Sequence, residues 1–247
     1  MSEANSPQAP TAAILVIGDE ILSGRTKDRN VGFIADTLTD IGMDLEEVRI
    51  VADREAAIVA AVRELSARYD YVFTSGGIGP THDDITADSI AKAFGLPIGI
   101  DPRAVDLLMP YWRSRGIEPN ESRLRMARIP EGATLIANAV SAAPGFRVEN
   151  VFVMAGVPAI MQAMMDEVVK MLPASRPILS KTIEARRGEG DIAAAAGEVQ
   201  KAHPDVRIGS YPYHDGEKFT TRLVLRSRDA GALAAARAAM DRALKNS

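Results

Sequence analysis

The first part of the sequence alternates short apolar runs with stretches of helical periodicity. The apolar runs cover residues 12–18, 45–51 and 69–75, and each has the length and composition of a buried strand. Apolar side chains recur at helical spacing over residues 30–41 and again after Asp53. A strand–helix–strand–helix–strand order requires right-handed crossovers, which place helices on both faces of a mostly parallel sheet. The pattern therefore predicts a three-layer α/β fold.

The remaining sequence adds further helices, one more buried strand and a second, smaller unit. The predicted helices cover residues 86–94, 102–116, 121–127 and 157–173, and the strand covers residues 151–156. After a linker over residues 173–177, the pattern predicts a small α+β unit with the order β-α-β-β-α: strands over 178–186, 206–212 and 219–227, and helices over 190–203 and 230–244. The expected domains are residues 11–173 and 177–247, preceded by a flexible tail over residues 1–10.

Composition narrows the chemistry that the chain can perform. There is no cysteine and there are three histidines, which excludes thiolate nucleophiles and cysteine-based zinc sites and argues against a histidine-rich metal site. We expect a reducing, cytoplasmic location. Residues 1–10 lack the features of a signal peptide, and no stretch approaches the roughly 18 apolar residues of a membrane helix. The net charge is −4, and the slight basic excess after residue 177 is too small to argue for nucleic-acid binding.

A glycine-rich loop, "TSGGIGPTHDDIT" at residues 74–86, directly follows the third predicted strand. Ligands of such sheets bind at the carboxyl ends of the strands, and a helix that starts there aims its positive dipole end at an anion. Gly76, Gly77 and Gly79 would let the backbone approach a phosphate closely, and Pro80 would stiffen the exit. The Walker lysine is missing and the spacing differs from the dinucleotide fingerprint. Phosphate binding is still favoured over a plain turn.

Carboxylates follow each of the first three predicted strands. Asp19 and Glu20 follow the first, Asp53 follows the second, and the adjacent pair Asp83 and Asp84 follows the third. Carboxylates beside a phosphate require a cation between them, and hard divalent ions bridge carboxylate to phosphate oxygens. The simpler alternative is that Asp53, and one of the pair, cap the following helices. As a group, the carboxylates predict a metal-assisted phosphate site. His82 lies beside them in the loop, but a lone exposed loop histidine is more often neither a metal ligand nor a proton donor, so we do not include it in the site.

Four ordered motifs carry a family resemblance. They are "GDEILSGRTKDRN", "TSGGIGPTHDDIT", "PEGATLIANAVSAAPGF" and "VFVMAGVP". Over residues 11–172 they resemble the molybdopterin-binding (MoaB/Mog-like) domain of molybdenum-cofactor biosynthesis, in the version at the amino end of competence/damage-inducible (CinA-type) proteins. Residues 177–246 resemble the small KH-type domain that follows in those proteins. The amidase domain of longer relatives has no counterpart in this sequence, so deamidase activity is not expected.

The resemblance also implies a set of site residues. The two aspartates treated as functional in the family match Asp53 and Asp84, and with Asp83 they form the predicted catalytic and metal-binding group for Mg, Mn or Co. The implied phosphate- or nucleotide-binding residues are Gly18, Asp19, Glu20, Asn30, Ser75, Gly76, Gly77, Gly79, Pro80, Thr81, Thr86, Gly156 and Pro158.

Two functions compete for this site. The leading hypothesis is an enzyme, a metal-dependent hydrolase of an ADP-ribose-like or dinucleotide pyrophosphate, in which a carboxylate or metal-bound water attacks. The alternative is a protein of molybdenum-cofactor biosynthesis that binds molybdopterin or transfers an adenylyl group. The pattern disfavours an RNA-binding function of the tail, since the tail has no GXXG loop and Tyr211 and Tyr213 fit an ordinary hairpin better than a stacking surface. Relatives of this kind imply a homo-oligomer, a dimer or a trimer.

Overall fold

The computed structural model describes residues 9–173 and 175–246 of the chain. The predicted tail over residues 1–10 lies outside this part, apart from its last two residues. The chain divides into two compact units between Ser175 and Arg176.

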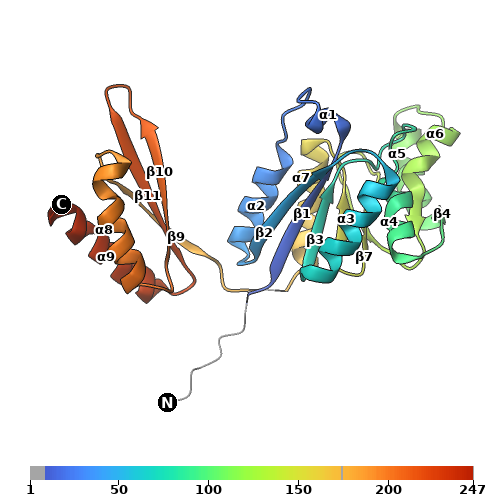
Figure 1. The fold of residues 1–247 in the computed structure, drawn as a ribbon. Helices are drawn as coiled ribbons and strands as arrows, with labels where there is room; N and C mark the ends of the chain where they lie inside the picture. Colours follow the sequence, from blue (N-terminus) through green and yellow to red (C-terminus); the bar gives the residue numbers. More distant parts are fainter. Residues whose placement is uncertain (1–8, 174, 247) are drawn as a thin grey trace, which may run out of the picture. The chain divides into compact units, whose positions relative to one another are not determined.

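A six-stranded sheet forms the centre of the first unit (Figure 1). Its strands, in spatial order, are β2 (Asp44–Val51), β1 (Thr11–Ile17), β3 (Tyr71–Ser75), β8 (Val151–Met154), β7 (Gly145–Val148) and β6 (Thr134–Ile136). The first four pair in parallel, whereas β7 pairs antiparallel with β8 and β6 antiparallel with β7. The mostly parallel sheet is therefore confirmed. The two antiparallel strands were not predicted, because segments of three or four residues carry no readable period.

Helices cover both faces of this sheet. In chain order they are α1 (Asp19–Leu22), α2 (Asn30–Asp40), α3 (Glu55–Arg68), α4 (Thr86–Phe94), α5 (Pro102–Ser114), α6 (Glu121–Leu124) with the 3-10 turn η1 (Arg125–Ala127), and α7 (Pro158–Met171). A short antiparallel ribbon of β4 (Ile98–Ile100) and β5 (Arg128–Pro130) lies beside α4. None of the helices in the described part of the chain is long and apolar enough to cross a membrane.

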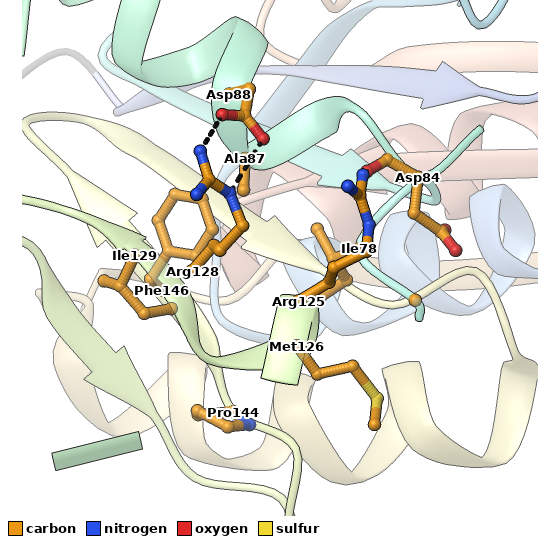
Figure 2. Close-up of a pocket in the computed structure, with 12 residues that line it drawn as sticks. Ile78, Asp84, Ala87, Asp88, Arg125, Met126, Arg128, Ile129, Pro144 and Phe146 are labelled. Atoms are coloured by element: carbon orange, nitrogen blue, oxygen red, sulfur yellow. Dashed lines mark hydrogen bonds and ion pairs between the residues drawn. The ribbon is translucent and has the colours of Figure 1, made fainter. Parts of the chain in front are cut away.

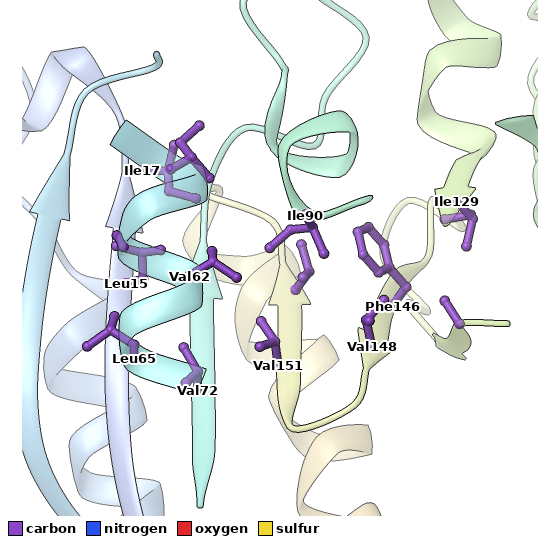
Figure 3. Close-up of a cluster of buried hydrophobic side chains, with 14 of the residues drawn as sticks. Leu15, Ile17, Val62, Leu65, Val72, Ile90, Ile129, Phe146, Val148 and Val151 are labelled. Carbon is purple, nitrogen blue, oxygen red and sulfur yellow. The ribbon is translucent and has the colours of Figure 1, made fainter. Parts of the chain in front are cut away.

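Two buried clusters hold the three layers together. On one face, the side chains of α3 pack on β1 and β3, and Figure 3 shows Val62 and Leu65 against Leu15 and Val72. On the other face, α2 and α7 cover a cluster that contains the fully buried Phe73 and Phe152. Because both faces are covered, β1 is buried almost throughout, which explains its continuous apolar run.

The second unit has the predicted order β-α-β-β-α. It consists of β9 (Leu179–Glu184), α8 (Glu189–Ala202), β10 (Arg207–His214), β11 (Phe219–Ser227) and α9 (Ala230–Asn246). The strands form an antiparallel sheet in the order β10-β11-β9. Its separate core includes Leu223 and Leu225 from the sheet, Ile192 from α8 and Met240 from α9.

Candidate functional site

The glycine-rich loop connects the carboxyl end of β3 to the first turn of α4. Gly76 has φ +111° and Gly77 has φ +71°, which are backbone conformations that residues with a side chain rarely adopt. A Cβ on Gly76 would lie 2.1 Å from the carbonyl oxygen of Ile17, and one on Gly77 would lie 2.1 Å from the Thr86 hydroxyl. The backbone of the loop is therefore held directly against the end of β1 and the start of α4. Only glycine fits at these two positions.

The carboxylate of Asp84 closes the loop. It accepts hydrogen bonds from the backbone N–H of Thr81, at 2.8 Å, and from the Thr81 hydroxyl. A Cβ on Gly79 would lie 2.6 Å from the same carboxylate, so the loop wraps tightly around it. Pro80 is exposed at the turn. α4 begins at Thr86 without a side-chain cap, so the suggestion that Asp83 or Asp84 caps this helix is wrong.

Carboxylates from three strand ends gather at one edge of the sheet, as the sequence predicted. Asp53 accepts a hydrogen bond from the backbone N–H of Asp19 at 2.8 Å. Burial raises the pKa of Asp53, and the nearby charges of Asp19, Glu20 and Asp83 raise it further. Asp53 does not cap α3, whose N-cap is Arg54. The helix-cap alternative for Asp53 is therefore wrong.

These carboxylates are engaged within the protein rather than grouped around one point. Within residues 9–173 and 175–246, no group of three or more Asp, Glu or His side chains is placed to hold a metal ion. Asp84 is engaged by Thr81, and Asp53 by Asp19. His82 is fully exposed, with its Nδ1 3.9 Å from the Asp83 carboxylate.

Asn30 joins the loop to two other elements. This first residue of α2 is 4% exposed, and its side-chain N–H groups donate to the Ser75 hydroxyl at 2.7 Å and to the carbonyl oxygen of Gly156 at 2.8 Å. A Cβ on Gly156 would lie 3.3 Å from the Cα of Gly76. The end of β3, the start of α2 and the turn after β8 are thereby fixed around the glycine loop, and the predicted residues Asn30, Ser75 and Gly156 belong to one assembly.

Two other predicted residues stand at the margins of this assembly. Gly18 is buried at the end of β1, and a Cβ there would lie 2.5 Å from the Glu20 carboxylate. Pro158 is the first residue of α7, where its missing N–H costs nothing. Both shape the backbone near the site.

An open pocket lies between the glycine loop and the segment that leads from η1 into β5 (Figure 2). Its lining residues are Gly77, Ile78, Gly79, Asp84, Ala87, Asp88, Arg125, Met126, Arg128, Ile129, Pro144 and Phe146. Arg128 forms an ion pair with Asp88, and Arg125 donates from Nη2 to the carbonyl oxygen of Asp84 at 3.1 Å. The pocket thus combines the glycine loop, two guanidinium groups and an apolar wall.

Sequence reasoning missed the arginine side of this pocket. Arg125 and Arg128 lie 39 or more residues beyond the loop, counted from Thr86, on the short elements η1 and β5. The one available signal was a pair of arginines three residues apart, which is common on solvated helices. Only the packing of η1 and β5 beside α4 brings them to the loop.

Comparisons with known proteins match both units. The model of a family described as a probable molybdopterin binding domain matches residues 13–177, and that of the middle domain of FAD synthase matches residues 177–247. A solved structure, CinA of Thermoplasma acidophilum, described as being of unknown function, is 34% identical with a TM-score of 0.61. The similarity covers 66% of this chain and 98% of that one.

Two relatives extend the similarity along the chain. A protein of Pyrobaculum calidifontis is 36% identical over 212 residues, which cover 82% of this chain and 81% of the relative. A probable FAD synthase of Caenorhabditis briggsae is 31% identical over 94% of this chain, and the matched part is 49% of the relative. The chain therefore spans about half the length of that relative.

These findings correct the leading functional hypothesis and describe the second unit. The leading hypothesis, a metal-dependent pyrophosphate hydrolase, is wrong, because the matches are to molybdopterin-binding domains and to relatives of the FAD synthase type. The second unit matches the middle domain of FAD synthase, so it is not an amidase domain.

Proposed function

Since residues 13–177 place the chain in the family of molybdopterin-binding domains, we propose that its first unit binds a phosphorylated pterin of the molybdopterin class. The observation that carries this proposal is the loop from Gly76 to Gly79, which follows the carboxyl end of β3, has glycine-only backbone conformations and leads into α4, a helix that begins without a side-chain cap. Helix N-termini preceded by glycine loops bind phosphate through backbone N–H groups and the helix dipole. The pterin ring would lie against the apolar wall of the pocket, which includes Met126, Ile129 and Phe146.

A flavin nucleotide is the second candidate ligand. It is favoured by the match of residues 177–247 to the middle domain of FAD synthase, and by the similarity to a probable FAD synthase over 94% of this chain. Flavins and pterins are both planar fused-ring heterocycles, and FMN, FAD and molybdopterin all carry phosphate. The same loop and the same apolar wall could therefore serve either ligand. The relative affinities of the protein for a pterin and for a flavin nucleotide distinguish the two candidates.

The test is a titration of the purified protein with molybdopterin released from a molybdoenzyme, with FMN and with FAD, followed by calorimetry or ligand fluorescence. We expect molybdopterin to bind more tightly than either flavin. Gly77→Ala should weaken binding by about 10-fold or more, because the Cβ forces the loop away from Thr86. Gly99→Ala is the matched control, since a Cβ there meets nothing within 4 Å.

The outcomes separate the two candidates. If a flavin nucleotide binds more tightly than molybdopterin, the pterin proposal is wrong and a flavin nucleotide is the ligand. Unchanged affinity in Gly77→Ala, with any of the three ligands, would show that the glycine loop is not the phosphate site.

A further inference from the structure

The sheet of the second unit has one covered face and one open face. α8 and α9 pack on the same face, where Leu223 and Leu225 of β11 join their core (Figure 1). Successive side chains of a strand point to opposite faces, so the residues between these core positions belong to the face that neither helix covers. The strand register places on this open face Ser180, Thr182 and Glu184 of β9, Arg207, Gly209, Tyr211 and Tyr213 of β10, and Thr220, Arg222, Val224 and Arg226 of β11.

Two arginines of the open face lie directly opposite each other without a counter-ion. Arg207 pairs with Arg226 across the two strands, and both residues are exposed. Neither guanidinium forms a hydrogen bond or an ion pair with any residue that the structure describes. Like charges at directly opposite positions of an antiparallel pair repel each other. Since Arg222 is balanced by Glu184, to which its Nε donates at 2.8 Å, the open face keeps two uncompensated positive charges, which suit an anionic partner.

An exposed aromatic ring lies next to this pair of arginines. Tyr211 is 51% exposed, and its hydroxyl has no partner within residues 9–173 and 175–246. A Cβ on Gly209 would lie 2.7 Å from Cε2 of Tyr211, so the ring occupies the space that a side chain at Gly209 would need. Gly209 stands between Tyr211 and Arg207 on the same face of β10. The ring and the guanidinium of Arg207 are therefore neighbours along the strand.

The second tyrosine of the open face is held by a charged pair. Tyr213 donates its hydroxyl to Oε2 of Glu184 at 2.7 Å, and the guanidinium of Arg222 lies 5.0 Å from the centre of its ring. Arg222 is also the residue directly opposite Tyr211. These contacts fix the part of the open face beside Tyr211. Fixed side chains lose less conformational entropy when a partner binds.

We propose that the open face binds single-stranded nucleic acid, with a base stacked on Tyr211 and phosphates held by Arg207 and Arg226. Proteins bind single strands through aromatic rings on which the bases stack and through basic groups that contact the backbone. An acidic peptide would also balance the arginines, but it would make no use of the exposed ring, so nucleic acid is the better fit. This proposal is independent of the pterin site, which lies in the first unit.

The sequence pattern disfavoured RNA binding because the tail has no GXXG loop, and that argument concerns the KH mode alone. A sheet face with exposed aromatic side chains is a different mode of binding. Arg226 lies 15 positions after Tyr211 in the sequence. Only the pairing of β10 with β11 brings the two side chains to one face. The small basic excess of the unit is therefore less informative than the placement of its arginines.

The test measures binding of a fluorescein-labelled oligouridylate of about 12 nucleotides to the full chain by fluorescence polarisation. The measurement is made at about 50 mM salt, where phosphate contacts are strong. Unlabelled oligothymidylate, a DNA duplex of the same length and polyglutamate serve as competitors. We expect the single strand to compete at least about 10-fold better than the duplex or polyglutamate, because only the single strand offers unstacked bases.

Variants of the aromatic residues test the stacking contact. Tyr211→Ala should weaken binding of the oligouridylate about 10-fold, and Tyr211→Trp should retain the affinity of the unmodified protein. Phe219→Ala is the matched control. Phe219 is 70% exposed in the same hairpin, but its register places it on the face of Leu223, so its replacement should leave the affinity unchanged.

Variants of the arginines test the phosphate contact. Arg226→Gln should weaken binding about 10-fold and reduce the slope of log affinity against log salt concentration by about 0.7. The melting temperature of the unliganded variant should not fall, because the substitution removes one of two opposed like charges. Arg242→Gln is the control for net charge, since Arg242 is an exposed residue of α9. It should leave both the affinity and the slope unchanged.

Several results would overturn the proposal. One is the absence of binding of the single strand to the full chain at low salt. Another is equal or better competition by the duplex or by polyglutamate, and polyglutamate as the best competitor would identify an acidic peptide as the partner. Unchanged affinity in Tyr211→Ala, or equal losses in the two control variants, would also contradict it. All of these results leave the pterin proposal untouched, because the variants lie in the second unit.

Discussion

At the scale of single residues, the site is defined by groups that the fold holds in costly environments. Gly76 and Gly77 adopt backbone conformations that other residues avoid, and Thr86 and Arg125 carry buried polar atoms that have no partner within residues 9–173 and 175–246. Asp53 is partly withdrawn from water next to other carboxylates. Features of this kind gather at functional sites more often than elsewhere, which supports a ligand at the glycine loop.

Asp53 leads to a prediction about pH. Its pKa is raised in the folded chain by burial and by neighbouring acids, so the folded state holds the proton more tightly than the unfolded state. The stabilising contribution is present below the ordinary aspartate pKa of about 3.9 and is lost as the pH rises through the raised value. Asp53→Asn keeps an acceptor for the Asp19 N–H. We therefore expect the variant to gain stability relative to the unmodified protein as the pH rises above about 3.9.

Urea denaturation across this pH range measures the effect, and Asp70→Asn provides a control of opposite sign. Hydrogen bonds from the backbone N–H and hydroxyl of Thr11 lower the pKa of Asp70, so its contribution is present at neutral pH and lost on acidification. Parallel pH profiles for the two variants would contradict the assignment for Asp53.

At the scale of elements, the long periodic segments were predictable and the short ones were not. α4 was predicted with its observed bounds, and Ile58, Val62 and Leu65 of α3 form the expected buried face. β4, β5, β6 and β7 were missed, since three or four residues do not establish a period and their pairing is decided by partners distant in sequence. The pocket wall built from β5 and β7 was missed for the same reason.

Packing between elements predicts a large effect at Phe152. This β8 side chain is 0% exposed and stacks on Phe73 of β3, with the ring centroids 5.4 Å apart. Phe152→Ala should destabilise the first unit by about 3 to 5 kcal/mol, through lost contacts and the cavity left behind. Phe219→Ala is the control, because Phe219 is 70% exposed and its replacement should change stability by about 0.5 kcal/mol or less. Equal losses in the two variants, measured by denaturant unfolding, would refute the packing argument.

At the scale of the whole molecule, each unit has its own hydrophobic core. The clusters around Phe73 and Val62 belong to the first unit, and the cluster around Leu223 belongs to the second. The boundary between Ser175 and Arg176 falls within the linker that was expected over residues 173–177. Units with separate cores usually fold independently.

We therefore expect residues 1–175, expressed alone, to fold and to bind the ligand with the dissociation constant of the full chain. Residues 176–247 alone should fold with lower stability, because a unit of this size buries a smaller fraction of its surface. Circular dichroism and calorimetry on the two fragments check both expectations. A first fragment that folds and binds at least 10-fold more weakly than the full chain would assign part of the site to the second unit.

The sequence by itself determined the α/β class, the resemblance to molybdopterin-binding domains, the position of the glycine loop and the convergence of carboxylates at one sheet edge. These follow from local periodicity, glycine chemistry and the rule that parallel strands end at the same edge. Tertiary structure decided what the carboxylates do and what completes the pocket. Asp84 is engaged by Thr81 and Asp53 by Asp19, while Arg125 reaches the loop. Contacts between residues about 40 positions apart depend on how short elements pack, and local sequence does not encode that packing.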